Sequence, residues 1–170
     1  MHSAQHPVTR CQTPSPLGPL TLAAQRGLLV GVWFDGQKHQ PDTSAWATEG
    51  THPVLLAACE QMAQYFAGER LVFDLPLGLL AGTTFQRHVW AALRAIPAGT
   101  TTSYGALAQG VGRPKAVRAV GAAVGRNPLG IVVPCHRVVG SQGALTGYAG
   151  GLERKRALLE LEQRAYKLPR

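Results

Sequence analysis

The stretch IVVPCHRVV, residues 131–139, carries the strongest signal for both the fold and the chemistry of this 170-residue chain. Its β-branched run stops at Pro134, and Cys135 and His136 follow directly. Short β-branched runs are typical of buried strands. We therefore expect a strand that ends at Pro134, with Cys135 at its end and inside a domain. A buried cysteine most often only fills space, but the adjacent histidine points to a reactive thiol.

The pairing of a cysteine with a histidine suggests nucleophilic chemistry. A free thiol with a pKa of about 8.5 is mostly protonated at neutral pH, and only the thiolate is the nucleophile. A histidine can take the proton, and a carboxylate on the far side of the imidazole stabilises the resulting cation. The acidic residues able to do so lie in one expected C-terminal helix, residues 152–164. These features fit a cysteine hydrolase and a cysteine that accepts a group equally well.

Charge is distributed unevenly along the chain. Residues 1–78 contain four Lys/Arg and six Asp/Glu, whereas residues 79–170 contain thirteen and three, so the net charges are −2 and +10. A basic field without interspersed carboxylates attracts a polyanion such as DNA. An arginine-rich composition from a GC-rich genome is the alternative explanation. No acidic residue lies between Asp74 and Glu153, but seven basic ones do: Arg87, Arg94, Arg113, Lys115, Arg118, Arg126 and Arg137.

The break in charge coincides with a break in composition. The glycine-containing stretch LGLLAGTT, residues 77–84, separates two runs that look structured, and such stretches mark connections. A length of 170 residues suits one domain or two small ones. We therefore expect two domains, residues 1–80 and residues 81–170.

The first half predicts a small α/β unit. Residues 20–24 and 27–34 predict two strands joined as a hairpin. The apolar spacing of residues 54–67 predicts an amphipathic helix. Residues 42–51 are polar and predict a loop, and residues 72–75 are expected to return to the sheet.

The second half predicts mainly helices. A helix is expected over residues 84–96 with Thr84 as its N-cap, and a shorter one over residues 104–109. A tight turn then leads into a helix over residues 114–125. Two short helices joined by a glycine-containing turn predict a helix-turn-helix. Such helix pairs also occur in proteins that never bind DNA, but the lack of carboxylates here favours DNA.

The three cysteines are an odd number without a close pair or metal-ligand spacing, which predicts no disulfide framework and no metal. Cys59 lies on an apolar helix stripe and is expected in the core, while Cys11 is expected to be an idle thiol in a flexible terminus. No stretch approaches about 18 consecutive apolar residues, and residues 1–10 lack the apolar core of a secretion signal. We expect a cytoplasmic protein without a membrane span.

The pentapeptide PCHRV, residues 134–138, resembles the acceptor motif of the O6-alkylguanine-DNA alkyltransferases, also called methylated-DNA–protein-cysteine methyltransferases. The resemblance extends over about residues 12–165. The further matching segments are RAVG (118–121), NP (127–128), GYxGG (147–151), the helix at 155–162, SPLGPL (15–20) and YFxG (65–68).

This resemblance implies an α+β fold, with a ribonuclease-H-like N-terminal α/β domain and a mainly helical C-terminal domain that contains the helix-turn-helix. The implied function is DNA repair by direct, irreversible and stoichiometric transfer of an alkyl group to an internal cysteine. The implied partner is double-stranded DNA containing O6-alkylguanine, with O4-alkylthymine as a second candidate substrate. No cofactor is implied, and we expect a monomer.

The resemblance assigns roles in proton transfer to five residues. Cys135 accepts the alkyl group. His136 relays the thiol proton through a water molecule, and Glu162 partners His136. Tyr104 and Lys155 help to protonate the departing guanine.

It also implies how the pocket is built. Asn127 orders the turn around the acceptor cysteine, and Tyr148 lines the pocket. The backbone N–H of Ala149 meets the O6 region of the guanine, at a position where some members have serine. The carbonyls of Cys135 and Val138 receive the exocyclic amine of the base.

DNA contacts follow from the same resemblance. Arg118 inserts into the duplex where the base leaves, and we expect Arg113, Lys115 and Arg126 to contact phosphates. Val117 replaces the alanine of some members on the groove-facing helix, which predicts looser contact. The resemblance implies entry into the minor groove, whereas the residues alone suggested the major groove.

Two other classes of function remain open from the residues alone. One is a helix-turn-helix regulator with a structural cysteine, which binds a preferred sequence and transfers nothing. The other is a cysteine hydrolase, which turns over many times.

Overall fold

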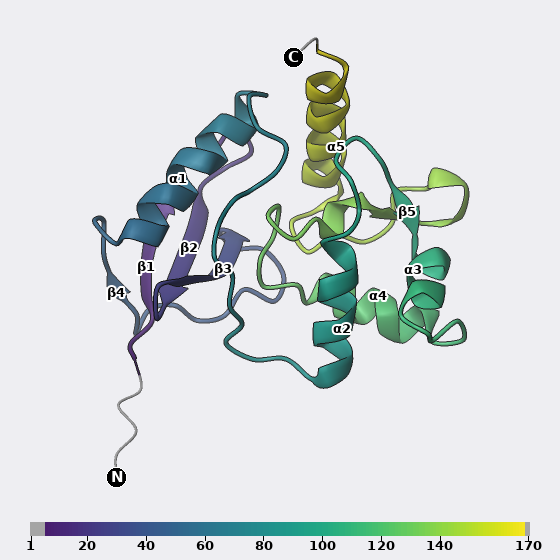
Figure 1. Ribbon diagram of the computed structural model, residues 1–170, viewed down its shortest axis with the longest axis horizontal. Coiled ribbons are helices and arrows are strands. Elements are labelled where there is room, and N and C mark those ends of the chain that lie inside the picture. The colour runs from purple at the N-terminus through teal and green to yellow at the C-terminus, as the bar shows by residue number, and fades with distance from the viewer. Residues whose placement is uncertain (1–5, 169–170) are drawn as a thin grey trace.

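The computed structural model describes residues 6–168. The prediction that residues 1–10 lack a secretion signal therefore falls partly on residues outside the described part of the chain. The chain folds into two side-by-side parts (Figure 1). One holds the main sheet and α1, and the other holds the remaining helices. The mixed α and β architecture expected from the resemblance is thus confirmed.

The main sheet contains four strands in the order β3-β2-β1-β4. The expected hairpin is confirmed as β2 and β3, and Arg26 and Gly27 between them have φ values of 53° and 74°. Two successive positive φ values match the right-handed twist of the flanking strands. The bounds of the strands are Thr9–Thr13 (β1), Leu20–Gln25 (β2), Leu28–Phe34 (β3) and Ala47–Thr48 (β4).

Helix α1, Pro53–Phe66, covers this sheet and confirms the helix expected there. Its buried stripe includes Leu55, Ala58, Met62 and Tyr65, at the spacing of three and four residues that places side chains on one helical face. This stripe packs with β1, β2 and β3 into the core of the first half.

Three expectations for the first half were wrong. Residues 9–13 are not a flexible terminus but strand β1, which pairs antiparallel with β2. The polar segment 42–51 contains the short strand β4, which pairs with β1. Residues 72–75 form no strand, and the connection pairs with the sheet through an isolated bridge between Leu29 and Leu77. The bridge ties this connection to the edge strand β3.

The second half contains four α-helices and short connecting elements within the described residues. Helices α3 and α5 begin at the expected residues, Tyr104 and Leu152, but α2 and α4 begin differently from the expectation. Thr83, rather than Thr84, caps α2 in a reciprocal capping box with Gln86, and α4 begins at Val117 because residues 113–116 form a turn of their own. The bounds are Thr84–Leu93 (α2), Thr102–Ser103 (β5), Tyr104–Gly110 (α3), Val117–Gly125 (α4), Cys135–Arg137 (η1), Val138–Val139 (β6), Ser141–Gly143 (η2) and Leu152–Lys167 (α5).

The strand expected to end at Pro134 is absent. Residues 131–133 are a buried turn in which Ile131 has a φ of 69°, a conformation that interrupts an extended strand. The backbone here is tied to the neighbouring half, because the N–H of Val32 donates to the carbonyl of Pro128 and that of Gly130 donates to the carbonyl of Val32. Burial alone therefore accounts for the apolar residues, and Cys135 begins the 3-10 helix η1 instead of ending a strand.

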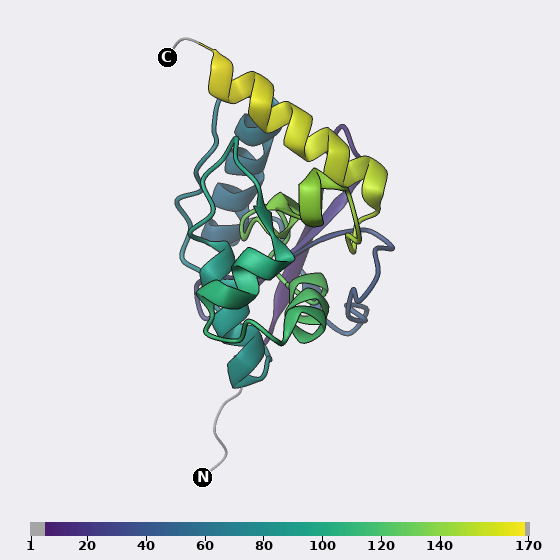
Figure 2. The same ribbon diagram turned by 90° about the vertical axis from the view of Figure 1, so that its right-hand side faces the viewer.

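One apolar core runs through both halves. Polar contacts cross between them as well, since Arg154 of α5 donates to the carbonyl of Leu17 and stacks over the ring of Phe34 at 4.4 Å. Helix α5 runs along one end of the molecule, where α1 also ends (Figures 1 and 2). Residues 67–83 connect the halves without a helix or a named strand, and the domain boundary at residue 80 stays a prediction.

Candidate active site

The thiol of Cys135 lies on a cavity of about 400 Å³ between the two halves. The wall formed by α4 is made of small residues, and a Cβ atom on Gly125 would meet nothing within 4 Å. This leaves room beside the helix. The lining residues are Lys38, His39, Tyr104, Gly121, Ala122, Val124, Gly125, Arg126, Cys135, Gly147, Tyr148 and Ala149.

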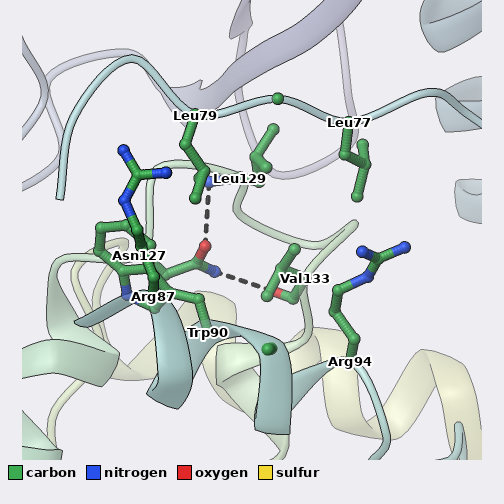
Figure 3. A pocket seen from close by; sticks show the side chains of 10 residues that line it. Leu77, Leu79, Arg87, Trp90, Arg94, Asn127, Leu129 and Val133 are labelled. Carbon is green, nitrogen blue, oxygen red and sulfur yellow. Dashed lines mark hydrogen bonds between the residues drawn. The ribbon is translucent and has the colours of Figure 1, made fainter. Parts of the chain in front are cut away.

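Asn127 fixes the turn that leads to Cys135. Its side chain is buried, donates to the carbonyl of Val133 at 2.8 Å and accepts from the N–H of Leu129 at 3.0 Å. Figure 3 shows both bonds spanning the turn, beside a separate cavity of about 150 Å³. The amide thus replaces backbone partners that a regular element would supply.

Cys135 is only 7% exposed. Burial raises the pKa of its thiol, while a hydrogen bond from Asn127 and the ammonium of Lys155 act to lower that pKa. The thiol is therefore mostly protonated at neutral pH, and a nearby base is needed to form the nucleophile.

Glu162 of α5 collects donors from both halves of the molecule. Its Oε1 lies 2.6 Å from Nε2 of His136, and Arg137 donates to its two oxygens at 2.9 Å each. The hydroxyl of Tyr65 in α1 donates to Oε1 at 2.8 Å. All four side chains are buried. Burial acts to raise the pKa of Glu162, but His136 and Arg137 outweigh it and lower the pKa to about 2, so the carboxylate is ionised.

This arrangement sets the tautomer of His136. Burial lowers the pKa of the imidazole despite the opposing effect of Glu162, so the ring is neutral at neutral pH. An ionised carboxylate only accepts, and Nε2 must therefore carry the proton. The other nitrogen, Nδ1, is buried and makes no hydrogen bond within residues 6–168. Nδ1 is the atom able to take a proton.

Tyr104 and Lys155 meet at the same loop. The ammonium of Lys155 donates to the carbonyls of Thr146 and Gly147 at 2.8 and 3.0 Å, and the hydroxyl of Tyr104 donates to the carbonyl of Thr146 at 3.2 Å. Burial lowers the pKa of Lys155 to about 8 and raises the pKa of Tyr104. Tyr104 lines the cavity, whereas Lys155 is fully buried and contacts the same loop without being among the lining residues.

The remaining residues assigned to the pocket do not all line the cavity. Tyr148 and Ala149 line the cavity, and the carbonyl of Ala149 accepts from the N–H of Lys38 across the two halves. Val138 is buried in β6 beside β5 and is not among the lining residues. The carbonyl of Cys135 already accepts from the N–H of Val138.

Four of the basic residues lie on the surface. Arg113, Lys115, Arg118 and Arg126 are exposed, and Arg126 also lines the cavity. Arg118 precedes the lining residue Ala122 by four positions, which places both on one face of α4.

Two residues of the site, Arg137 and Tyr65, were not predicted from the sequence. Arg137 was counted among the basic field, but it is buried and donates to Glu162 and to the carbonyl of Ile96. Its position directly after His136 was the available signal. Tyr65 lies on an apolar stripe, and nothing in the sequence links it to a residue 97 positions away.

Metal ligation is not suggested by the described residues. Within residues 6–168, no three His, Cys, Asp or Glu side chains gather as a metal site would require. In the same part of the chain, no helix is long and apolar enough to cross a membrane.

Comparison with known families matches almost the whole chain. The ribonuclease-like domain of 6-O-methylguanine DNA methyltransferase matches residues 11–79, and the DNA-binding domain of the same proteins matches residues 84–164. The methylated-DNA–protein-cysteine methyltransferase of Mycolicibacterium paratuberculosis is 51% identical over 150 residues, which are 88% of this chain and 89% of that protein.

Solved structures show the same likeness. The O6-methylguanine methyltransferase of Mycobacterium tuberculosis superposes with a TM-score of 0.86 at 47% identity, covering 95% of each chain. A structure of the M. tuberculosis protein OGT in complex with DNA superposes with a TM-score of 0.85 at 46% identity, covering 92% of this chain and 94% of that one.

The contact between Tyr65 and Glu162 predicts a loss of stability in Tyr65→Phe. A hydrogen bond to a buried charge typically contributes about 2 kcal/mol. We expect the free energy of unfolding to fall by that amount, seen as a lower urea midpoint at unchanged slope. Tyr166 lies on α5 and is 65% exposed, so Tyr166→Phe is a matched control that should change stability by less than about 0.5 kcal/mol. Equal effects of the two substitutions would contradict the role of the hydroxyl.

The lowered pKa of Glu162 predicts acid sensitivity. Its stabilising contribution is complete above the ordinary pKa of 4.5 and is lost as the pH falls towards about 2, a loss of order 3 kcal/mol. The lowered pKa of His136 acts in the same direction below 6.5, because the unfolded chain takes up that proton first.

Urea unfolding across this pH range measures the effect. Glu162→Gln should have lower stability throughout and a flatter dependence between pH 4.5 and about 2. An unchanged slope in this variant would assign the acid sensitivity to other carboxylates.

Proposed function

The chain belongs to the family of 6-O-methylguanine DNA methyltransferases, and we propose that it repairs DNA by moving an alkyl group directly and irreversibly from O6 of guanine to the thiol of Cys135. The observation that carries this proposal is the position of that thiol. It lies on a cavity of about 400 Å³, next in sequence to a neutral histidine whose Nδ1 is free to take a proton. Binding sites for small molecules commonly have volumes of about 300–1,000 Å³, so the volume of this cavity suits one extruded base.

The proposed reaction is an in-line displacement at the alkyl carbon. The thiol proton passes through a water to Nδ1 of His136, and Glu162 stabilises the imidazolium that forms. The sulfur of Cys135 then bonds to the alkyl carbon while the bond from that carbon to O6 breaks. The electron pair stays on the guanine, which leaves neutral after taking a proton from Tyr104 beside Lys155. Positioned proton transfer of this kind typically contributes about 100–10,000-fold.

The product of this reaction explains its stoichiometry. A thioether lacks the polarised bond of an acyl intermediate, so water does not release the alkyl group. Each chain therefore acts once. We also propose that the chain acts as a monomer, and the reduced thiol that transfer requires fits a cytoplasmic setting.

We propose that the base is held by backbone groups together with Tyr148. The N–H of Ala149 faces O6, and the carbonyls of Cys135 and Val138 receive the exocyclic amine. A carbonyl oxygen has two lone pairs, so the bond that Cys135 already accepts from Val138 leaves one for the ligand. O4-alkylthymine would use the same thiol and remains the second candidate substrate.

DNA binding is proposed for the helix-turn-helix of α3 and α4. A base inside a duplex must be extruded before a pocket can receive it, at a cost of a few kcal/mol. Arg118 is exposed on the face of α4 that borders the cavity, which supports its insertion into the gap. The small residues Gly121, Ala122 and Gly125 make that face slim enough for a minor groove. Arg113, Lys115 and Arg126 are proposed to contact phosphates.

Stoichiometry tests the proposed function against the two other classes. With DNA whose O6-methyl group is labelled, we expect one label per chain, on Cys135. A sequence-specific regulator takes up none, and a hydrolase releases many equivalents. Either result would refute the proposal.

Cys135→Ala should abolish transfer and leave DNA binding nearly unchanged. The thiol is buried in the cavity, whereas the proposed phosphate contacts are exposed. Single-turnover transfer and binding to methylated duplex measure the two properties in parallel. Loss of binding together with transfer would contradict this division of roles.

The variant Arg118→Ala distinguishes a role in base extrusion from simple electrostatic attraction to DNA phosphates. We expect slower transfer from duplex DNA but nearly unchanged transfer from free O6-benzylguanine, which needs no extrusion. Lys115→Ala is the control for a phosphate contact and should weaken binding to any sequence, lowering the salt slope by about 0.9. Equal loss on duplex and free base would indicate a damaged pocket instead.

A further inference from the structure

Two thiols face each other in the half of the molecule that does not hold the acceptor cysteine. Cys11 lies in β1 and Cys59 lies in α1, and their sulfur atoms are 3.7 Å apart. Both are free thiols. This corrects the expectation for Cys11, which is 9% exposed and belongs to the core, and it gives Cys59 a partner that its place on an apolar stripe did not reveal.

The fold holds this pair in place. Cys11 is opposite Leu22 in the pairing of β1 with β2, so its position is set by the sheet register. Cys59 lies between the buried residues Ala58 and Met62 of α1, the helix that packs on this sheet. Both partners lie in regular secondary structure. A disulfide needs the sulfur atoms to approach from 3.7 Å to about 2.05 Å.

The two thiols differ in reactivity and access. Cys59 is only partly buried, and hydrogen bonding by Cys11 lowers its pKa to about 7 against the opposing effect of burial. The same contact and burial raise the pKa of Cys11. Burial also raises the pKa of Cys135. Cys59 is thus the thiol with the largest thiolate fraction, and thiolates are the form that oxidants attack.

We propose that Cys11 and Cys59 form a redox modification site, at which a hydroperoxide oxidises Cys59 and Cys11 then closes a disulfide. This site is separate from the alkyl-acceptor chemistry, and it does not depend on the proposed function. It directs a small oxidant to the first half of the chain and leaves the thiol of Cys135 reduced.

The proposed oxidation takes place in two steps. In the first, the thiolate of Cys59 attacks one peroxide oxygen, so that a sulfur–oxygen bond forms, the oxygen–oxygen bond breaks and an alcohol or water leaves. In the second, the sulfur of Cys11 attacks the sulfenic acid of Cys59. The disulfide forms, the sulfur–oxygen bond breaks, and the departing hydroxide takes the proton of Cys11 to become water. The peroxide is reduced by two electrons, which the two sulfur atoms supply.

The experiment treats the full reduced chain with a limited dose of hydrogen peroxide, blocks the remaining thiols and maps peptides without reduction. We expect a peptide in which Cys11 is joined to Cys59, with a mass loss of about 2 Da. Free thiols should fall from three to one, located at Cys135, and dithiothreitol should restore all three. Cys59 should react at least about tenfold faster than Cys135.

Two serine variants test the order of the steps. In Cys11→Ser, Cys59 should accumulate as a sulfenic acid that dimedone traps. In Cys59→Ser, the buried Cys11 should remain reduced at the same dose. Oxidation of Cys135 as fast as Cys59, or conversion of Cys59 to sulfinic acid without the disulfide in the unmodified chain, would overturn the proposal. The peptide map of the unmodified chain decides the matter if either variant fails to fold.

Discussion

The buried carboxylate of Glu162 accepts hydrogen bonds from His136, Arg137 and Tyr65, and the placement of the site depends on this contact. Removing an isolated carboxylate from water costs several kcal/mol, which is recovered only when its oxygens are well bonded. Here one donor is charged, and two others come from different halves of the chain. The carboxylate therefore fixes η1 against α5, and it fixes α1 against both.

This constraint explains why the two halves act together. Tyr65 belongs to the half without the acceptor thiol, yet its hydroxyl completes the shell of Glu162. At the cavity, the carbonyl of Ala149 accepts from the N–H of Lys38. Lys38 and His39 of the first half line the cavity together with residues of the second half, which also contains Cys135. Movement between the halves would therefore disturb both the cavity and the orientation of His136.

Sequence patterns predicted the elements that depend on local spacing, including the β2–β3 hairpin and α1. They did not predict β1, whose pairing with β2 depends on tertiary contact. They also wrongly predicted a strand at residues 131–133, because a turn that is buried against β3 requires apolar side chains as a strand does. The adjacency of Cys135 and His136 indicated a reactive thiol, and the resemblance identified Glu162 as the partner of the histidine. The role of Tyr65 depends on a contact between residues 97 positions apart, which no periodicity encodes.

Burial of the acceptor thiol limits its reactivity. It raises the pKa of Cys135, so few thiolates exist until a base draws the proton away. The thiol also lies on the cavity that Tyr104 lines, next to the loop that binds the ammonium of Lys155. In the proposed single-turnover reaction, a chain whose thiol is lost to another electrophile can no longer accept an alkyl group. Low exposure together with a protonated resting state preserves the thiol, while the more exposed Cys59 has the lower pKa and meets small oxidants first.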